Sequence, residues 1–519
     1  MAITTTDYAQ QRNWRRRPRV LKRTASAVTA AFAFVLVPAA HAYDWRFVPN
    51  VNLTETLTDN VGLTAGNSKE GDLVTQVSPG FTLSTDGPRI KARINYALQA
   101  TLYATSDRGT RLSNQLNAGG TATLIRDMLY VDATAFASEQ SISAFGPQSF
   151  NNVNDTGNRA NVHSYTISPY LFNRYGSFAT SQVRFTHEAV GANSTLLSNT
   201  NTDRIQALVS SGPQYIRGNW GLQASTEKKR YSDIDSVDQS SISANAGYSI
   251  VPTIRLTATG GYEKNTYVTL GDKPQGKFYT AGFIWTPTSR TNLTVNAGRR
   301  YFGNTYFLAA NHRARNTVFS LNYSEDITST QGQFVTTAVI DTSSQLNLLY
   351  TPQIADPAAR QQFVDLLIRQ FGLAPALAVP VNSLTNRYFL QKSLQGSVAV
   401  SGAHSTVIGT LFDTRREAQS QQLTVPGLDD STKQIGASAG WNLQLSPRSS
   451  ALANISYARS TSLVTDLQTT YKIARIGMST TFQPKLNGTL ELRHTQQASG
   501  SFGGDIRENA ITASVFAQF

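Results

Sequence analysis

The sequence predicts an all-β protein, a transmembrane antiparallel β-barrel of about 20–22 strands in the outer membrane of a Gram-negative cell. Three observations predict this fold. Apolar and polar residues alternate along most of the chain, an export signal precedes them, and no later apolar stretch reaches the ~18 residues that a membrane-spanning helix needs. A barrel strand needs an apolar residue only at every second position, so the mean hydropathy stays below zero.

Residues 1–42 have the pattern of a secretory signal peptide, and residues 43–519 are predicted to form the barrel. Basic residues cluster between positions 12 and 23, the apolar stretch Ala25–Val37 follows, and Ala40-His41-Ala42 places cleavage before Tyr43. Arg16-Arg17 raises the twin-arginine route, but the apolar pair that should follow is missing, so we expect the general secretory route. The alternatives are an uncleaved anchor and a disordered basic tail.

Charge and cysteine content exclude several classes of protein. The formal charge of +13 falls to +7 without residues 1–42, which carry seven basic residues and one acidic residue, and the remaining charge is not clustered. We therefore expect no nucleic-acid partner. The chain has no cysteine, which excludes thiolate nucleophiles and Cys-ligated metals and suits a protein that crosses an oxidising periplasm unfolded.

The clearest predicted strand covers residues 89–103. Its apolar face should contact lipid and its polar face should line the lumen. The apolar face holds Ile90, Ala92, Ile94, Tyr96, Leu98, Ala100 and Leu102, and the polar face holds Arg89, Lys91, Arg93, Asn95, Gln99 and Thr101. A strand of about fifteen residues exceeds the usual length in soluble proteins and fits a tilted membrane strand.

The same alternation recurs at 253–263, 293–300 and 486–493 and in the last nine residues of the chain. The last stretch ends at Phe519. An alternating strand that ends in an aromatic residue is typical of the closing strand of an outer-membrane barrel. We therefore predict that Phe519 is the signal by which the barrel-assembly machinery recognises this protein.

Short and long connections alternate, as in bacterial barrels with short periplasmic turns and longer extracellular loops. Short turns are predicted at 86–88, 173–176, 251–253, 287–290, 446–448 and 483–485. Long loops are predicted at 58–71, 142–161, 189–201, 303–312, 417–431 and 498–506. Phe283, Trp285 and Trp441 precede proline-containing turns, where an aromatic girdle should lie.

The strand number must be even if both termini are periplasmic. About twenty-one strands are visible outside 326–386, so we assign one more to Gln333–Ile340. One amphipathic helix is predicted at 357–371, with Asp356-Pro357 at its start and Gly372 after its end, inside a long loop or the lumen. A β-helix or β-propeller would need repeats of fixed length, and none recurs.

Few motifs in the chain indicate chemistry. His163, His187, His312, His404 and His494 are far apart in the sequence and lack the spacing of metal ligands, and no nucleophile elbow, phosphate loop or dinucleotide motif occurs. The sequence therefore predicts neither an enzyme nor a bound cofactor. A metal site assembled across the barrel and a Ser–His hydrolase on its surface remain the alternatives.

Charged residues that should face the lumen are more informative. By strand phase these are Arg89, Lys91, Arg93, Arg184, Arg255, Arg300 and Arg493, together with Glu188, Glu263 and Glu491. One interpretation is that they pair with and solvate one another as lumen filling. The other is a pore lining that interacts with a charged or hydroxyl-rich solute.

The middle of the chain carries short motifs in a distinctive order. They are Ser168-Pro169-Tyr170, Ser211-Gly212, Gly261-Tyr262-Glu263 with Asn265, Trp285-Thr286-Pro287 with Arg290-Thr291, Gly298-Arg299-Arg300-Tyr301-Phe302-Gly303, His312-Arg313 with Arg315 and Thr317, and Tyr323 with Glu325. In this order they resemble the outer-membrane barrel family associated with the PEP-CTERM/exosortase protein-sorting system, over most of the mature chain. The resemblance implies a setting of exopolysaccharide biosynthesis and export and supplies no catalytic residues.

Two functions follow as hypotheses. The first is a channel or accessory component for the export of exopolysaccharide or another large polar solute, with polysaccharide and periplasmic export components as partners. The second is a structural barrel with a closed lumen that anchors surface protein or matrix polymer. An outer-membrane enzyme is a distant third, and a TonB-dependent transporter is disfavoured because strands begin near Trp45 and leave no room for an N-terminal plug domain. On every reading, outer-membrane lipid is a partner.

Overall fold

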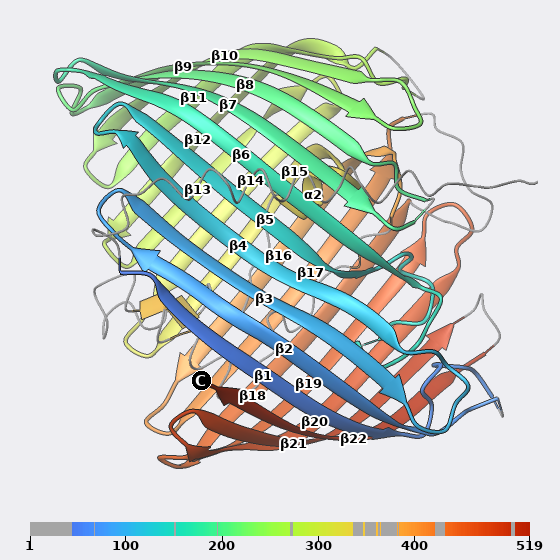
Figure 1. The fold of residues 1–519 in the computed structure, drawn as a ribbon. Coiled ribbons are helices and arrows are strands. Elements are labelled where there is room, and N and C mark those ends of the chain that lie inside the picture. Colours follow the sequence, from blue (N-terminus) through green and yellow to red (C-terminus); the bar gives the residue numbers. More distant parts are fainter. Residues whose placement is uncertain are drawn as a thin grey trace, which may run out of the picture. The chain divides into compact units, whose positions relative to one another are not determined.

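The strands between Arg46 and Gln518 form one closed antiparallel sheet in the computed structural model of the chain (Figure 1). The structure describes residues 44–519 except 67, 150–151, 195, 270–272, 336–345, 348–359, 362–363, 365–380, 382–383, 421–430 and 500–503. The predicted signal peptide at 1–42 lies outside the described residues.

The described residues form 22 strands and the short helix α2 (Thr330–Val335). The first eleven strands are β1 (Arg46–Thr58), β2 (Asp72–Asp86), β3 (Ile90–Tyr103), β4 (Arg111–Ile125), β5 (Leu129–Ser141), β6 (Arg159–Tyr175), β7 (Ala179–Ala192), β8 (Thr200–Ser211), β9 (Gly218–Tyr231), β10 (Val237–Val251) and β11 (Ile254–Asn265). The others are β12 (Gln275–Thr288), β13 (Thr291–Arg300), β14 (Gly303–Arg313), β15 (Thr317–Ser329), β16 (Tyr388–Ser401), β17 (Ser405–Ala418), β18 (Thr432–Ser446), β19 (Ser449–Ser462), β20 (Gln468–Gln483), β21 (Leu486–Ser499) and β22 (Ile506–Gln518). Within the described ranges no helix is long and apolar enough to cross a membrane.

Each strand pairs with the next along the chain, and the last strand returns to the first. β22 pairs with β1 from Asn50↔Gln518 to Thr58↔Ala510. A ring closed in this way leaves no sheet edge, so the backbone groups along the strands can find partners without water. The predicted antiparallel barrel is confirmed, and 22 strands among the described residues fall within the predicted range.

The two faces of the sheet differ as the alternation predicts. On β3, Leu102 is 42% exposed on the outer face while its neighbour Thr101 is 2% exposed on the inner face. On β22, Ile511 and Val515 are exposed, and Ala510 is buried. Large apolar side chains on the outside of a closed barrel require lipid around them, so the protein is an outer-membrane β-barrel.

The connections divide between the two rims as predicted. Turns of two residues, such as 252–253, to six residues, 212–217, share one rim with both ends of the barrel chain, which identifies that rim as periplasmic. The six predicted short turns all lie there, within a few residues of their expected positions. Trp285 and Trp441 are exposed on the outer face near this rim, as expected for an aromatic girdle.

Three predictions for the connections were wrong. The predicted loop 303–312 is strand β14, which follows β13 after the tight turn at Tyr301 and Phe302. Its alternation is hidden because Tyr306 and Phe307 are adjacent and both exposed. The extra strand that an even count requires is therefore β14, and the described part of Gln333–Ile340 is helical. The predicted loop 189–201 is shortened to 193–199.

The predicted helix at 357–371 lies mostly outside the described residues. Arg360, Gln361 and Val364 are described there, and all three are helical. They belong to the long connection between β15 and β16, which also contains α2.

A pair of arginine substitutions tests the phase of β3. Ile94→Arg should destabilise the barrel by about 2–4 kcal/mol if Ile94 lies near the bilayer midplane, because the charge would face lipid. Asn95→Arg should cost less than about 1 kcal/mol, because Asn95 lies on the polar face, where it accepts a hydrogen bond from Thr82 at 2.9 Å. Urea unfolding of the refolded protein in phospholipid vesicles measures both. Equal losses at the two positions would mean that the assigned phase is wrong.

Candidate functional site in the barrel lumen

The strand register places most of the predicted lumen residues on the inner face of the barrel. These are Lys91 and Arg93 on β3, Arg184 on β7, Arg255 and Glu263 on β11, Arg300 on β13, and Glu491 and Arg493 on β21. Arg89 instead lies exposed in the turn before β3, at the periplasmic rim. Lys91 is also near this rim, where it pairs with Asp86 at 3.1 Å and stays exposed to solvent.

The most deeply buried ion pair among the described residues joins β21 to β22. Arg493 and Glu508 lie 3.2 Å apart, and their side chains are 1% and 2% exposed. Glu508 also accepts hydrogen bonds from Thr58 on β1 at 2.8 Å and from Asn154 at 2.7 Å. A buried charge is tolerated only when paired and hydrogen-bonded, so this cluster locks the inner wall beside the seam where the barrel closes.

Other predicted lumen charges also have partners of opposite sign. Arg300 contacts Glu263 at 2.6 Å and Asp326 at 2.7 Å, and Glu491 contacts Arg475 at 3.1 Å. On β7, Arg184 contacts Asp132 at 2.8 Å and lies 4.0 Å from the centre of the Tyr170 ring. The charges therefore largely neutralise one another in the closed structure.

A cluster that sequence reasoning missed lies on β9. Lys229 is 5% exposed and donates a hydrogen bond from Nζ to Ser329 Oγ on β15 at 3.2 Å. Its neighbour Glu227 accepts a hydrogen bond from Arg204 Nε at 2.7 Å. Strand alternation could have revealed this cluster. Leu222 on the same strand is exposed on the outer face, so residues 227 and 229, an odd number of positions away, point inward. Arg475, Arg416 and Glu508 were missed in the same way.

The Lys229 contact crosses the lumen rather than running along the wall. Five strands separate β9 from β15 in the ring. Beside it, the hydroxyls of Tyr231 on β9 and Tyr388 on β16 lie 3.3 Å apart, and the ring of Tyr267 stacks on Tyr388 at 4.6 Å. These contacts join β9, β15, β16 and the connection between β11 and β12 close to the extracellular rim.

The loop 142–158 between β5 and β6 reaches inward to β21 and β22. The backbone N–H of Gln148 donates to Gln497 Oε1 at 3.1 Å, and Asn154 donates to Glu508. Four strands lie between β5 and β22 in the ring, so the loop covers that sector of the extracellular end.

Arg108 ties this loop to its neighbours. The guanidinium contacts Glu70, between β1 and β2, at 3.2 Å and Asp155 at 3.0 Å. Burial alone would lower the pKa of Arg108, but the hydrogen bonds and charges of Glu70 and Asp155 outweigh it and raise the pKa above its ordinary value. Arg108, between β3 and β4, therefore stays charged and holds the connections β1–β2, β3–β4 and β5–β6 together.

The connection between β15 and β16 supplies contacts at both ends of the lumen. Leu346 and Val364 are buried against residues near the periplasmic turns of β15–β17, namely Val318, Ala399 and Ile408. Leu384 is buried near the extracellular rim against residues of β6, β7 and the following loop, namely Ala160, Val162, Val190 and Leu197. Two hydrogen bonds, at 2.8 and 2.9 Å, join the Val381 backbone to Gln434 on β18. The described residues Leu346, Val364, Val381 and Leu384 of this connection therefore contact the barrel wall.

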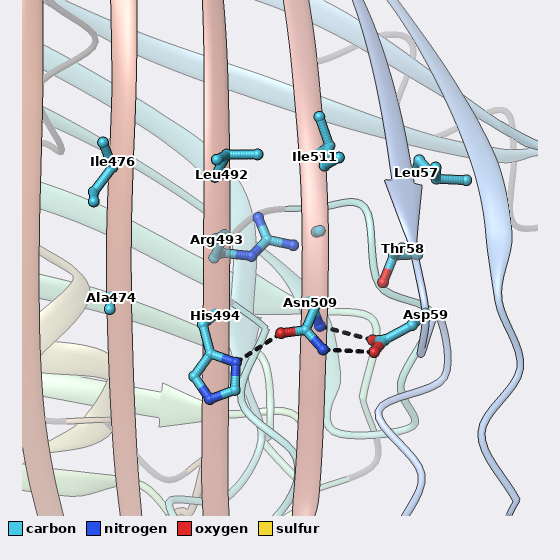
Figure 2. A pocket seen from close by; sticks show the side chains of 11 residues that line it. Leu57, Thr58, Asp59, Ala474, Ile476, Leu492, Arg493, His494, Asn509 and Ile511 are labelled. Carbon is cyan, nitrogen blue, oxygen red and sulfur yellow. Dashed lines mark hydrogen bonds between the residues drawn. The ribbon is translucent and has the colours of Figure 1, made fainter.

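Three of the described histidines contact different polar partners. His187 contacts the carboxylate of Asp203 at 2.7 Å, and His312 contacts the hydroxyl of Thr291 at 2.8 Å. Through these contacts, each of the two histidines therefore has only one of the two partners that a Ser–His–Asp type of site combines. His494 contacts Asn509 at 2.8 Å on the outer face (Figure 2). A nucleophilic hydrolase needs hydroxyl, base and orienting group together. In the described part of the chain, no three His, Cys, Asp or Glu side chains could hold a metal ion.

Comparison with known proteins finds similar solved structures. No family model matches the chain, and no curated protein matches it. Solved structures that are similar include the siderophore receptor PirA from Pseudomonas aeruginosa (12% identity, 91% of this chain and 80% of that chain, TM-score 0.47) and the ferric enterobactin receptor PfeA from the same organism (12%, 91%, 80%, 0.48). The FrpB iron transporter from Neisseria meningitidis is 9% identical over 91% of this chain and 82% of that chain, with a TM-score of 0.46.

The Arg493–Glu508 pair can be tested by removing one charge. Glu508→Gln should destabilise the barrel by about 3 kcal/mol or more, because Arg493 would remain buried without a counter-charge. Asp86→Asn is the matched control, since it removes an acid from the exposed pair with Lys91 and should cost less than about 1 kcal/mol. Urea unfolding in vesicles gives both values. A Glu508→Gln protein as stable as the control would show that the buried pair is not important for stability.

Proposed function

We propose that this barrel is a channel or accessory component for moving exopolysaccharide, or another large polar solute, across the outer membrane, without enzymatic activity. The observation that supports it is the closed ring of 22 strands among the described residues, with a polar inner wall. A ring of this size encloses a wide lumen unless side chains and loops fill it. A conduit function requires that this filling can move.

The nature of the filling supports a conduit that is closed at rest. Lumen-crossing contacts such as Lys229–Ser329 and Gln148–Gln497 are polar, and their groups can exchange hydrogen bonds with water or with sugar hydroxyls. Paired charges such as Arg300 and Glu263 offer donors and acceptors without a large net field. The resemblance to the PEP-CTERM-associated barrels supports exopolysaccharide as the solute.

The second candidate is a structural barrel that stays closed and anchors polymer or protein through its loops. The specific observation in its favour is that the lumen-crossing contacts include buried packing, such as Tyr267 stacked on Tyr388 and Leu384 among apolar neighbours. Such packing resists opening more than isolated hydrogen bonds do.

A deletion strain separates the two functions. If the barrel exports polymer, its loss should reduce released polysaccharide and increase the periplasmic fraction, while total synthesis continues. Restoring the wild-type gene is the control. Normal release with weaker retention of polymer at the cell surface would favour the structural barrel. Normal release, normal retention and no periplasmic build-up would contradict both.

A further inference from the structure

A groove of about 610 Å³ lies on the outer face of the barrel, across the seam where β22 meets β1. Four aliphatic side chains form a row along it (Figure 2), namely Ile476, Leu492, Ile511 and Leu57. Each is the register partner of the next, on β20, β21, β22 and β1, and all four are about half exposed. We call this the seam groove, and the small side chain of Ala474, two residues before Ile476 on β20, also lines it.

A polar row lies immediately on the extracellular side of the aliphatic row. His494 Nδ1 and Asn509 Oδ1 are 2.8 Å apart, and Asn509 donates to both oxygens of Asp59 at 2.7 Å (Figure 2). Both carboxylate oxygens of Asp59 are thus engaged within the row. The row can offer hydrogen bonds to ester, amide or hydroxyl groups that lie between water and hydrocarbon.

Basic side chains form the next row toward the extracellular rim. Lys472 on β20 is the register partner of Gln496 on β21, which is the partner of Arg507 on β22. Lys472 and Arg507 are exposed and make no ion pair with the described residues. Arg459, on neighbouring β19, is exposed one step closer to the rim. The order along the strands is therefore cationic, polar and apolar.

We propose that the seam groove binds one phosphate-bearing lipid of the outer leaflet. The acyl chain lies along Ile476, Leu492 and Ile511, and the phosphate lies between Lys472 and Arg507. This order of chemistry matches such a lipid from its head group to its tail, and cations near a membrane surface attract anionic head groups. The polar row then meets the linkage between phosphate and acyl chain. Because the lipid lies over β20–β22, it also lies next to the seam where β22 pairs with β1.

Binding of lipid A to the full-length protein tests the proposal. The protein, in nanodiscs of phosphatidylcholine, is titrated with bisphosphorylated lipid A, and bound lipid is counted by native mass spectrometry. Lys472→Gln with Arg507→Gln should weaken binding about tenfold or more. Arg448→Gln with Lys485→Gln is the matched control, because it removes the same charge from turns at the opposite rim and should leave binding unchanged.

A second variant tests the groove itself. Ala474→Trp fills the hollow and keeps every charge, so it should also weaken binding about tenfold, with no loss of folded barrel by gel mobility. Inorganic phosphate in excess should not displace the lipid. Equal weakening by the two charge-removal pairs would overturn the site at Lys472 and Arg507. If Ala474→Trp leaves binding unchanged, or if free phosphate displaces the lipid, the lipid is held by surface charge alone and not by the groove. Either result would overturn the proposal.

Discussion

The rest of the structure depends on one constraint, the requirement that no backbone hydrogen-bonding group along the strands faces lipid unpaired. An open sheet of this length would leave two edges, so the chain closes by pairing its last strand with its first. The pairing continues to the terminal residue, whose backbone N–H donates to Pro49 O at 3.0 Å. The strand that carries the predicted assembly signal Phe519 is therefore the strand that completes the ring, and the ring can close only after that strand is in place.

Closure also determines what happens inside the barrel. Once the ring is complete, inward-facing charges lose most of their contact with bulk water and must find partners across strands, as Arg493 and Glu508 do. The same enclosure lets loops from one sector bind the wall of another, as Asn154 does at Glu508. Polar contacts between described residues therefore cross the lumen, and smaller apolar clusters, such as the one around Leu384, lie beside them.

The sequence predicted the local features of this structure and missed the distant ones. The phase of β3 could be predicted because apolar residues occupy every second position from Ile90 to Leu102. β14 could not, because Tyr306 and Phe307 break that alternation. Lys229 and Ser329 are a hundred residues apart, and only ring closure brings β9 and β15 close enough for contact. Alternation carries no information about distances across a lumen, so the sequence offered pairing of the charges as one interpretation but could not show which charges pair or which loops reach inward.

The central claim is that the lumen is a polar conduit held closed by inward packing, and conductance in a planar bilayer tests it most directly. The intact protein should be closed, with rare openings. Leu384→Asp places a charge in a buried cluster near the extracellular rim and should give longer-lived openings, because this cluster is one of the contacts between Leu384 and the barrel wall. Leu463→Asp, at an exposed leucine of another extracellular loop, should behave like the intact protein. A large, steady conductance from the intact barrel, or no difference between the two variants, would contradict the claim.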